Sequence, residues 1–199
     1  MLLRSVSFRD YCLYSGTHYF DLTPRHTDSQ DGTVARKRPI ILFGGKNGAG
    51  KTTLLDAIRL TLYGKQSLDG NISEADYKQE LKSRIHRSKN GSAPASGSSV
   101  GVEFDFSASG VTDTYKVERF WDIEGQQLKE FLKVTMNGSL LEGVDAEHWS
   151  SFIAEIVPER LSQLFFFDGE KIQNIAEDVS SNRSIATSLF SENLPRAGQ

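Results

Sequence analysis

The sequence predicts an α/β domain. This prediction rests on a glycine-rich motif, on the segments that flank the motif, and on two later segments with alternating side chains. Residues 45–52 read Gly-Lys-Asn-Gly-Ala-Gly-Lys-Thr, between an apolar run at 39–43 and a segment of helical periodicity. Residues 100–106 and 115–121 alternate between two faces, as strands do. A buried strand, a loop, a helix and an antiparallel meander are therefore expected in this order.

The N-terminal segment predicts two strands. Residues 2–8 alternate apolar and polar side chains with one break, as an edge-forming strand would, and a strand pattern resumes at 18–22 after an aromatic turn at 11–15. Residues 24–38 are polar, contain a glycine and end in three consecutive cations. We interpret them as a loop that leads into the buried strand at 39–43.

The segment 45–53 has the residue types that hold a nucleoside triphosphate. Its glycines let successive backbone N–H groups point at phosphate oxygens, and the helix N-terminus adds partial positive charge. Lys51 is expected to stabilise the β- and γ-phosphates of ATP, and the Thr52 hydroxyl to hold Mg²⁺. The predicted ATP-binding residues are Gly45, Lys46, Asn47, Gly48, Ala49, Gly50, Lys51, Thr52 and Thr53. The alternative is a glycine-rich turn that binds no nucleotide.

A helix is expected after the loop, because Leu54, Leu55, Ile58 and Leu62 recur near helical period and Gly64 stands where a C-cap would. Beyond it the sequence changes in composition. Residues 74–89 are hydrophilic, and residues 90–99 have the composition of a flexible linker.

A basic segment lies within 78–89. It holds five cations against Glu80: Lys78, Lys82, Arg84, Arg87 and Lys89. Such a segment can neutralise DNA phosphates, and it can equally be an ordinary solvated face. His86, in the same segment, is interpreted as a surface residue rather than a metal ligand.

The meander is expected to continue after 115–121 with a strand at 131–136, which the hairpin signal Asn137-Gly138 follows. Asp145 is then expected to cap a helix that runs through Ile156, and Pro158 marks its end.

The composition indicates the cellular compartment of the protein and argues against some classes of function. The single cysteine, Cys12, cannot form an intramolecular disulfide, which favours a reducing compartment. No apolar run reaches the length of a membrane span and the first ten residues lack a signal-peptide core, so we expect a cytoplasmic protein without membrane contact. A net charge of -3 argues against a globally basic nucleic-acid binder.

Several blocks together resemble one ATPase family. The N-terminal strands with their aromatic turn, the loop and the meander resemble the first lobe of an SMC-type ATPase head, as in SbcC. Residues 38–58, 62–65 (Leu-Tyr-Gly-Lys) and 164–172 (Leu-Phe-Phe-Phe-Asp-Gly-Glu-Lys-Ile) are similar to the DndD-like ATPases of bacterial DNA phosphorothioate modification. The resemblance covers 1–183 and leaves 184–199 as a polar tail that is expected to be disordered or truncated.

This resemblance implies a P-loop NTPase fold, the N-terminal lobe of an SMC/ABC-type ATPase head with a mixed sheet and an antiparallel meander. In that family a coiled coil and a second lobe follow, and the second lobe brings the signature motif, an Mg²⁺-organising aspartate and the catalytic glutamate. Expected partners are a second ATPase lobe or a homodimer partner, other DNA-modification proteins, and DNA, reached indirectly or through 78–89. Related heads also hold nucleotide with an Arg in the N-terminal aromatic turn, which residues 10–14 lack.

Residues 164–170 have three interpretations. Four apolar residues followed by Asp168 are typical of a Walker B strand, in which Asp168 holds Mg²⁺ and Glu170 polarises water. The resemblance instead favours a mobile junction loop, in which Asp168 replaces a family Gln that senses Mg²⁺ and the γ-phosphate. The third interpretation is a core strand that ends in a turn.

The sequence therefore predicts an ATP- and Mg²⁺-binding lobe of an SMC-type ATPase that acts in DNA phosphorothioate modification or double-strand break repair. Hydrolysis would need the missing second lobe and dimerisation, so the lone chain, with Lys51 as its catalytic side chain, is expected to bind ATP without efficient turnover. Two alternatives remain. One is a self-contained P-loop NTPase that uses Asp168 and Glu170 as a Walker B pair, and the other is a non-enzymatic truncated nucleotide-binding fragment.

Overall fold

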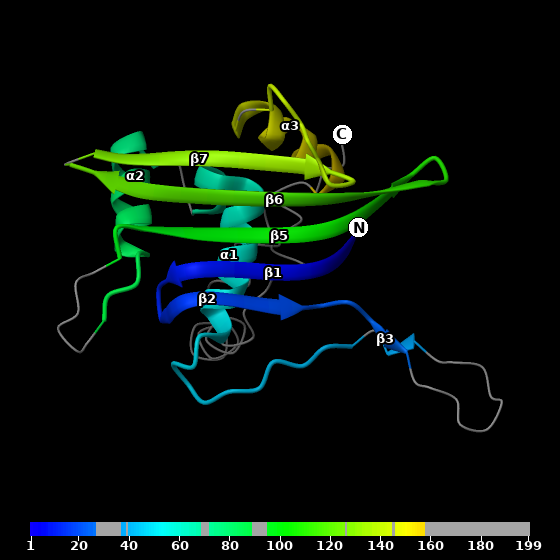
Figure 1. Cartoon of the computed structure of the whole chain (residues 1–199), viewed down its shortest axis with the longest axis horizontal. Helices are drawn as coiled ribbons and strands as arrows, with labels where there is room; N and C mark the ends of the chain where they lie inside the picture. The colour runs from blue at the N-terminus through cyan, green and yellow to red at the C-terminus, as the bar shows by residue number, and fades with distance from the viewer. Residues whose placement is uncertain are drawn as a thin grey trace, which may run out of the picture. The chain divides into compact units, whose positions relative to one another are not determined.

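A six-stranded sheet with the strand order β2-β1-β5-β6-β7-β8 forms the frame of the protein (Figure 1). The computed structural model describes residues 1–26, 37–38, 40–68, 72–88, 95–125, 127–144 and 146–157. These residues belong to one of the two units into which the chain divides, Met1–Ser162. The strands of the sheet are β1 (Leu2–Tyr11), β2 (Tyr14–Asp21), β5 (Gly97–Ala108), β6 (Val111–Glu124), β7 (Gln127–Met136) and β8 (Ser139–Leu140). A separate pair joins β3 (Arg25–His26) to β4 (Lys37–Arg38).

The predicted antiparallel meander is confirmed in β5, β6 and β7. Its register places Val102 opposite Val117 and Phe104 opposite Tyr115, so that the alternating side chains share one face. The Asn137-Gly138 signal is confirmed as the turn between β7 and β8, and both residues have the positive φ that this turn requires.

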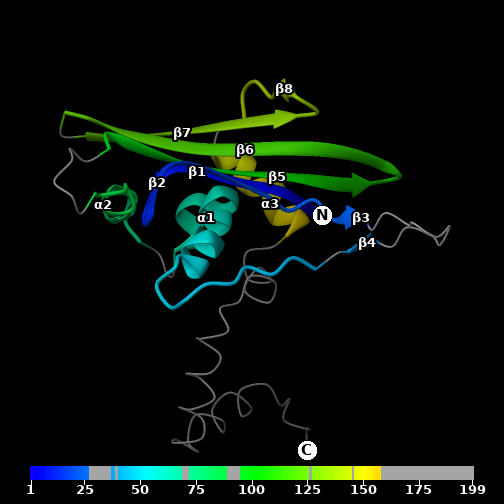
Figure 2. The same ribbon diagram turned by 60° about the horizontal axis from the view of Figure 1, so that its bottom comes forward.

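The helices cover one face of the sheet, as Figure 2 shows for α1 and α3. They are α1 (Lys51–Tyr63), which a 3₁₀ turn at Gly64–Ser67 follows, α2 (Glu74–Ser83) and α3 (Ala146–Ile156). The helix predicted after the loop and its end at Gly64 are confirmed, as is the helix ending at Ile156. None of the described helices has the length and the apolar composition that a membrane crossing requires.

The core lies between the helices and the sheet because both contribute a regular apolar face. On α1, Leu54, Ala57, Ile58 and Leu62 are buried. The facing strands bury Val6, Phe8, Val100, Val102, Phe104, Val117 and Trp121. Trp149 of α3 joins this core, where its indole N–H donates to the Leu62 carbonyl at 2.9 Å.

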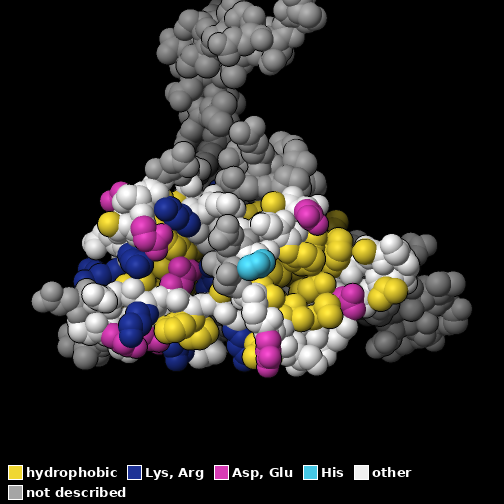
Figure 3. Space-filling model, turned by 90° about the horizontal axis from the view of Figure 1, so that it is seen from above, with side chains coloured by type: hydrophobic (Ala, Val, Ile, Leu, Met, Phe, Trp, Pro, Cys, Tyr) yellow, Lys and Arg dark blue, Asp and Glu magenta, His cyan; other side chains and the backbone are white. Residues whose placement is uncertain are grey.

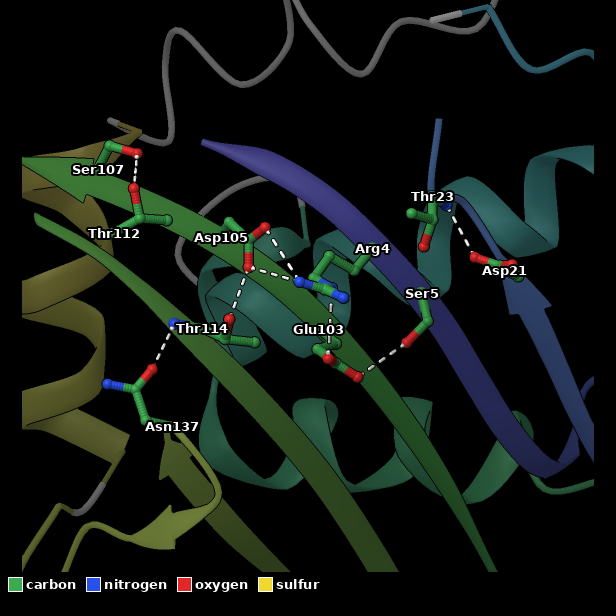
Figure 4. Close-up of polar contacts among 10 residues, drawn as sticks. All are labelled: Arg4, Ser5, Asp21, Thr23, Glu103, Asp105, Ser107, Thr112, Thr114 and Asn137. Carbon is green, nitrogen blue, oxygen red and sulfur yellow. Dashed lines mark hydrogen bonds and ion pairs between the residues drawn. The ribbon is translucent and has the colours of Figure 1, made fainter. Parts of the chain in front are cut away.

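The opposite face of the sheet is polar, as an antiparallel sheet with one solvent-facing side allows. Figure 4 shows Arg4 reaching across to β5, where it pairs with Glu103 at 3.7 Å and with Asp105 at 3.3 Å. The Thr114 hydroxyl donates to Asp105 at 2.7 Å. These cross-strand contacts tie β1, β5 and β6 together on the side away from the helices.

The structure corrects the expected buried strand at 39–43. Residues 40–46 form no strand, and Ile40 and Leu42 are 79% and 89% exposed. A strand needs a hydrogen-bonded neighbour, and no described strand pairs with this run. All described strand pairs are antiparallel, so the mixed sheet is also absent from this part of the chain. Pro39 lies outside the described residues.

The expected linker at 90–99 is wrong over its last three residues. Gly97–Ser99 begin β5 and pair with Asp122, Trp121 and Phe120 of β6. Cross-strand pairing therefore outweighs the flexible composition, and a Cβ at Gly97 would overlap the Asp122 side chain. Residues 90–94 lie outside the described ranges, as do Asp145, Pro158 and the proposed boundary at 183.

Candidate functional site

The loop at 44–50 connects the exposed run at 40–43 to α1 (Figure 1). The loop folds on itself, since the Ala49 N–H donates to the Lys46 carbonyl at 3.0 Å. Gly48 and Gly50 have φ values of 79° and 95°, in the left-handed region that favours glycine. The backbone conformation of the loop thus favours glycine at positions 48 and 50.

The N-terminus of α1 is an anion-attracting end. Gly50 is the N-cap, no side chain caps the helix, and the first turn has no acidic residue that would offset the helix dipole. The N–H groups of the first turn have no intrahelical acceptor. This arrangement can hold a phosphate group through backbone donors.

Lys51 folds back over the loop that precedes it. Its Nζ donates to the Gly45 carbonyl at 2.9 Å and to the Lys46 carbonyl at 3.2 Å. The side chain is exposed, as is Thr52, while Thr53 is half-buried. The structure therefore brings the predicted residues 45–53 together in one loop and helix end, with the ammonium group beside the backbone.

Gly50 is the buried residue of the loop, and the aromatic ring of Tyr14 covers it. The Tyr14 hydroxyl donates to the Gly50 carbonyl at 3.2 Å. A Cβ at Gly50 would lie 2.6 Å from the Tyr14 hydroxyl oxygen and 2.9 Å from ring carbon Cζ. The loop thus contacts the β1–β2 hairpin directly.

Aromatic side chains of the hairpin form a cluster beside the loop. The centroid of the Tyr14 ring lies 4.5 Å from the centroid of the Phe8 ring and 5.1 Å from that of the His18 ring. The ring centroids of Phe20 and Phe43 are 5.7 Å apart, and Phe43 directly precedes the loop. Sequence reasoning missed this cluster. The even spacing of Tyr14, His18 and Phe20, which places them on one face of a strand, was the available signal.

Some cations of the basic segment at 78–89 already bind other side chains of the protein. Arg84, 15% exposed, donates to the Tyr11 hydroxyl at 2.7 Å and pairs with Glu80 at 3.0 Å, and Lys78 pairs with Glu74 at 3.7 Å. Burial raises the pKa of Tyr11, so its hydroxyl keeps its proton. On the face seen in Figure 3, Lys and Arg side chains lie among Asp and Glu side chains rather than forming a uniform basic surface.

His86 has a structural contact, since its Nδ1 lies 2.8 Å from the Cys12 carbonyl oxygen. Within the described ranges, no three His, Cys, Asp or Glu side chains are grouped as metal ligands. Asp168 and Glu170 lie outside these ranges, so the junction-loop and Walker B interpretations both stay predictions.

Comparison with known families agrees with this geometry. The AAA domain family matches the chain over residues 8–193, which include the loop, α1 and the whole described sheet from Phe8 onward. No curated protein sequence matches the chain.

Proposed function

The chain belongs to the AAA domain family of nucleotide-binding ATPases, and from this premise we propose that it binds MgATP at residues 45–53. The observation that carries the proposal is the direct passage from the glycine loop into the uncapped N-terminus of α1. Backbone donors, a positive helix end and the Lys51 ammonium converge there.

The proposal assigns separate roles to the backbone and to the side chains of this segment. The N–H groups of 47–53 cradle the phosphates, and Thr52 holds Mg²⁺. Lys51 exchanges the carbonyls of Gly45 and Lys46 for phosphate oxygens, because the ammonium attracts a negatively charged oxygen more strongly than a neutral carbonyl oxygen. Bound Mg²⁺ would neutralise negative charge on the triphosphate.

We further propose that the protein is the first lobe of an SMC-type head. The exposed apolar run at 40–43 supports this proposal, because such side chains are ordinarily covered by a further element. A second lobe or a homodimer partner would cover the run and complete the catalytic site. ATP binding and assembly would then be linked thermodynamically.

The DNA-modification role rests on the resemblance of 38–58, 62–65 and 164–172 to DndD-like ATPases. DNA and the other modification proteins are its proposed partners. Because Arg84 is engaged with Tyr11 and Glu80, direct contact with DNA phosphates through the basic segment would fall to Lys82 and Arg87, which are exposed.

Calorimetric titration of MgATP into the full chain tests nucleotide binding. Lys51→Ala should weaken affinity by about 1.5–3 kcal/mol, the scale of a charge-assisted hydrogen bond. Lys82→Ala, at an exposed lysine on α2, is the matched control and should leave affinity unchanged. Equal affinity for the wild type and Lys51→Ala would refute the assignment.

Phosphate release by the same preparations separates the alternatives. An isolated first lobe should bind MgATP with negligible turnover, and Asp168→Gln should preserve binding. Steady release that both Lys51→Ala and Asp168→Asn abolish would instead support a self-contained NTPase with Asp168 and Glu170 as its Walker B pair. Binding without turnover, even after a second lobe of a related ATPase is supplied, would favour a non-enzymatic fragment.

A further inference from the structure

The turn between β1 and β2, defined as residues 10–14 and so including the adjoining strand ends, holds two residues in an unfavourable backbone conformation. Asp10 and Cys12 have φ values of 48° and 50°, in the left-handed region that side-chain-bearing residues seldom occupy. The pairing of β1 with β2 also changes register between Arg9 and Tyr11. Such conformations persist only where the surroundings determine them, and they often mark functional positions.

The segment after α2 supplies those surroundings. The Cys12 N–H donates to the Arg84 carbonyl at 2.7 Å, and the His86 N–H donates to the Asp10 carbonyl at 2.8 Å. Tyr11 forms a β-bridge with Ile85 between these two bonds. From the side of β2, the Gly16 N–H donates to the Asp10 carboxylate at 2.8 Å. The turn is therefore held on both sides of Tyr11.

Tyr14 leaves this turn and covers Gly50. Its ring packs against both Phe8 and His18, which limits its rotation, and its hydroxyl donates to the Gly50 carbonyl. A phenol keeps its proton at neutral pH, and burial raises the pKa of Tyr14 further, so the hydroxyl remains a hydrogen-bond donor.

The Gly50 carbonyl and the Lys51 N–H belong to the same peptide unit. Because that unit is planar, a hydrogen bond that orients the carbonyl also orients the N–H, which points the opposite way. The Lys51 N–H is the first donor of α1 and one of the proposed phosphate contacts. The Leu54 N–H, at 3.0 Å from the same carbonyl, holds the peptide from the helix side.

We propose that the β1–β2 turn sets the conformation of the phosphate loop through Tyr14, which acts as a positioning residue on the Gly50–Lys51 peptide. The inference rests on the proposed nucleotide-binding function. Tyr14 contacts the loop backbone and needs no contact with the base, so its effect applies to any ligand that carries the triphosphate. The turn thereby links the segment 84–86 to the nucleotide site.

Tyr14→Phe tests the inference, because it removes the hydroxyl and keeps the ring. Affinities of the full chain for MgATP and for magnesium tripolyphosphate, which has no base or ribose, are measured by calorimetry. Both should fall by about 2- to 10-fold, the loss expected for one neutral hydrogen bond. Tyr19→Phe, at an exposed tyrosine of the same strand, is the control and should change neither affinity.

Each other outcome has a defined meaning. Wild-type affinity of Tyr14→Phe for both ligands overturns the positioning role. A loss for MgATP alone also overturns it, because Tyr14 would then act on the nucleoside. Absence of MgATP binding by the wild type would refute the proposed function itself. The thermal midpoints of the two variants, measured in parallel, must agree within a few degrees, and a large drop for Tyr14→Phe alone would assign the residue to folding instead.

Discussion

Arg119 ties the last turn of α1 to the sheet. It is 2% exposed, its Nε donates to the Thr61 carbonyl at 3.0 Å, and its guanidinium pairs with Glu130 at 3.1 Å. The cation thus satisfies a carbonyl that the helix end leaves unpaired and lies at the negative end of the helix dipole. The Tyr77 hydroxyl donates to Glu130 at 2.8 Å, which brings α2 into the same network.

The Arg119 guanidinium explains why a glycine follows α1. Gly64 has a φ of 53°, and a Cβ there would lie 2.8 Å from the guanidinium carbon. Gly64→Ala should therefore lower the free energy of unfolding by about 1–3 kcal/mol, measured by urea denaturation. Gly138→Ala is the control, since its φ of 82° is also positive but no atom lies within 4 Å of the added Cβ. A Gly64→Ala loss no larger than the control's would contradict the role of Arg119.

The run at 40–43 is paired with no strand among the described residues, and only its last side chain, Phe43, has an aromatic contact, with Phe20. Its four apolar side chains are all exposed, and it directly precedes the glycine loop at 44–50. An apolar run of this kind gains stability only when another chain segment covers it. The chain is accordingly expected to be prone to self-association.

Polar substitution of this run separates its role in folding from its role in assembly. Ile40→Ser with Leu42→Ser should change the free energy of unfolding by less than about 0.5 kcal/mol each, because both side chains are already exposed. Leu62→Ala, at a fully buried position of α1, should cost about 2–5 kcal/mol in the same urea titration. The double variant should also reduce self-association in sizing experiments and weaken binding of a second-lobe fragment. A large loss of stability would place the run inside the fold.

Buried acids make the stability of the whole domain dependent on pH. Burial raises the pKa of Cys12, Tyr11 and Tyr77 above their ordinary values. Above pH ~8.5 for a thiol and ~10 for a phenol, the unfolded chain releases these protons while the folded chain keeps them. The folded state then binds more protons than the unfolded state, so stability falls as pH rises.

We therefore expect full stability from these groups below pH ~8.5 and a progressive loss above it. Urea denaturation at steps between pH 7 and about 10.5 measures this slope directly. Cys12→Ala should remove the part of the decline that begins near pH ~8.5 and leave the part due to the tyrosines. A free energy of unfolding that rises over this interval would show that burial does not control these groups.

The sequence alone determined those features that depend only on neighbouring residues in the chain. The glycines at 45–50, the start of α1 at Lys51 and its end at Gly64 follow from backbone conformation and helix periodicity. The alternation along 100–106 and 115–121 likewise determined the meander, because period-two alternation suits only a pleated strand with one buried face. One local signal was missed: Ser73 caps the N-terminus of α2, and its hydroxyl accepts a hydrogen bond from the Asp76 N–H.

The tertiary structure alone decided which segments meet. Gly97–Ser99 have linker composition yet form a strand, because β6 offers their backbone a partner. The run at 40–43 has strand composition yet forms none in the described part of the chain, because hydrophobicity creates a need for burial without supplying a neighbour. The contacts of Tyr14 with Gly50, and of Arg84 with Tyr11, join residues 36 and 73 positions apart. Such contacts depend on how whole elements pack against one another, and no local pattern in the sequence encodes them.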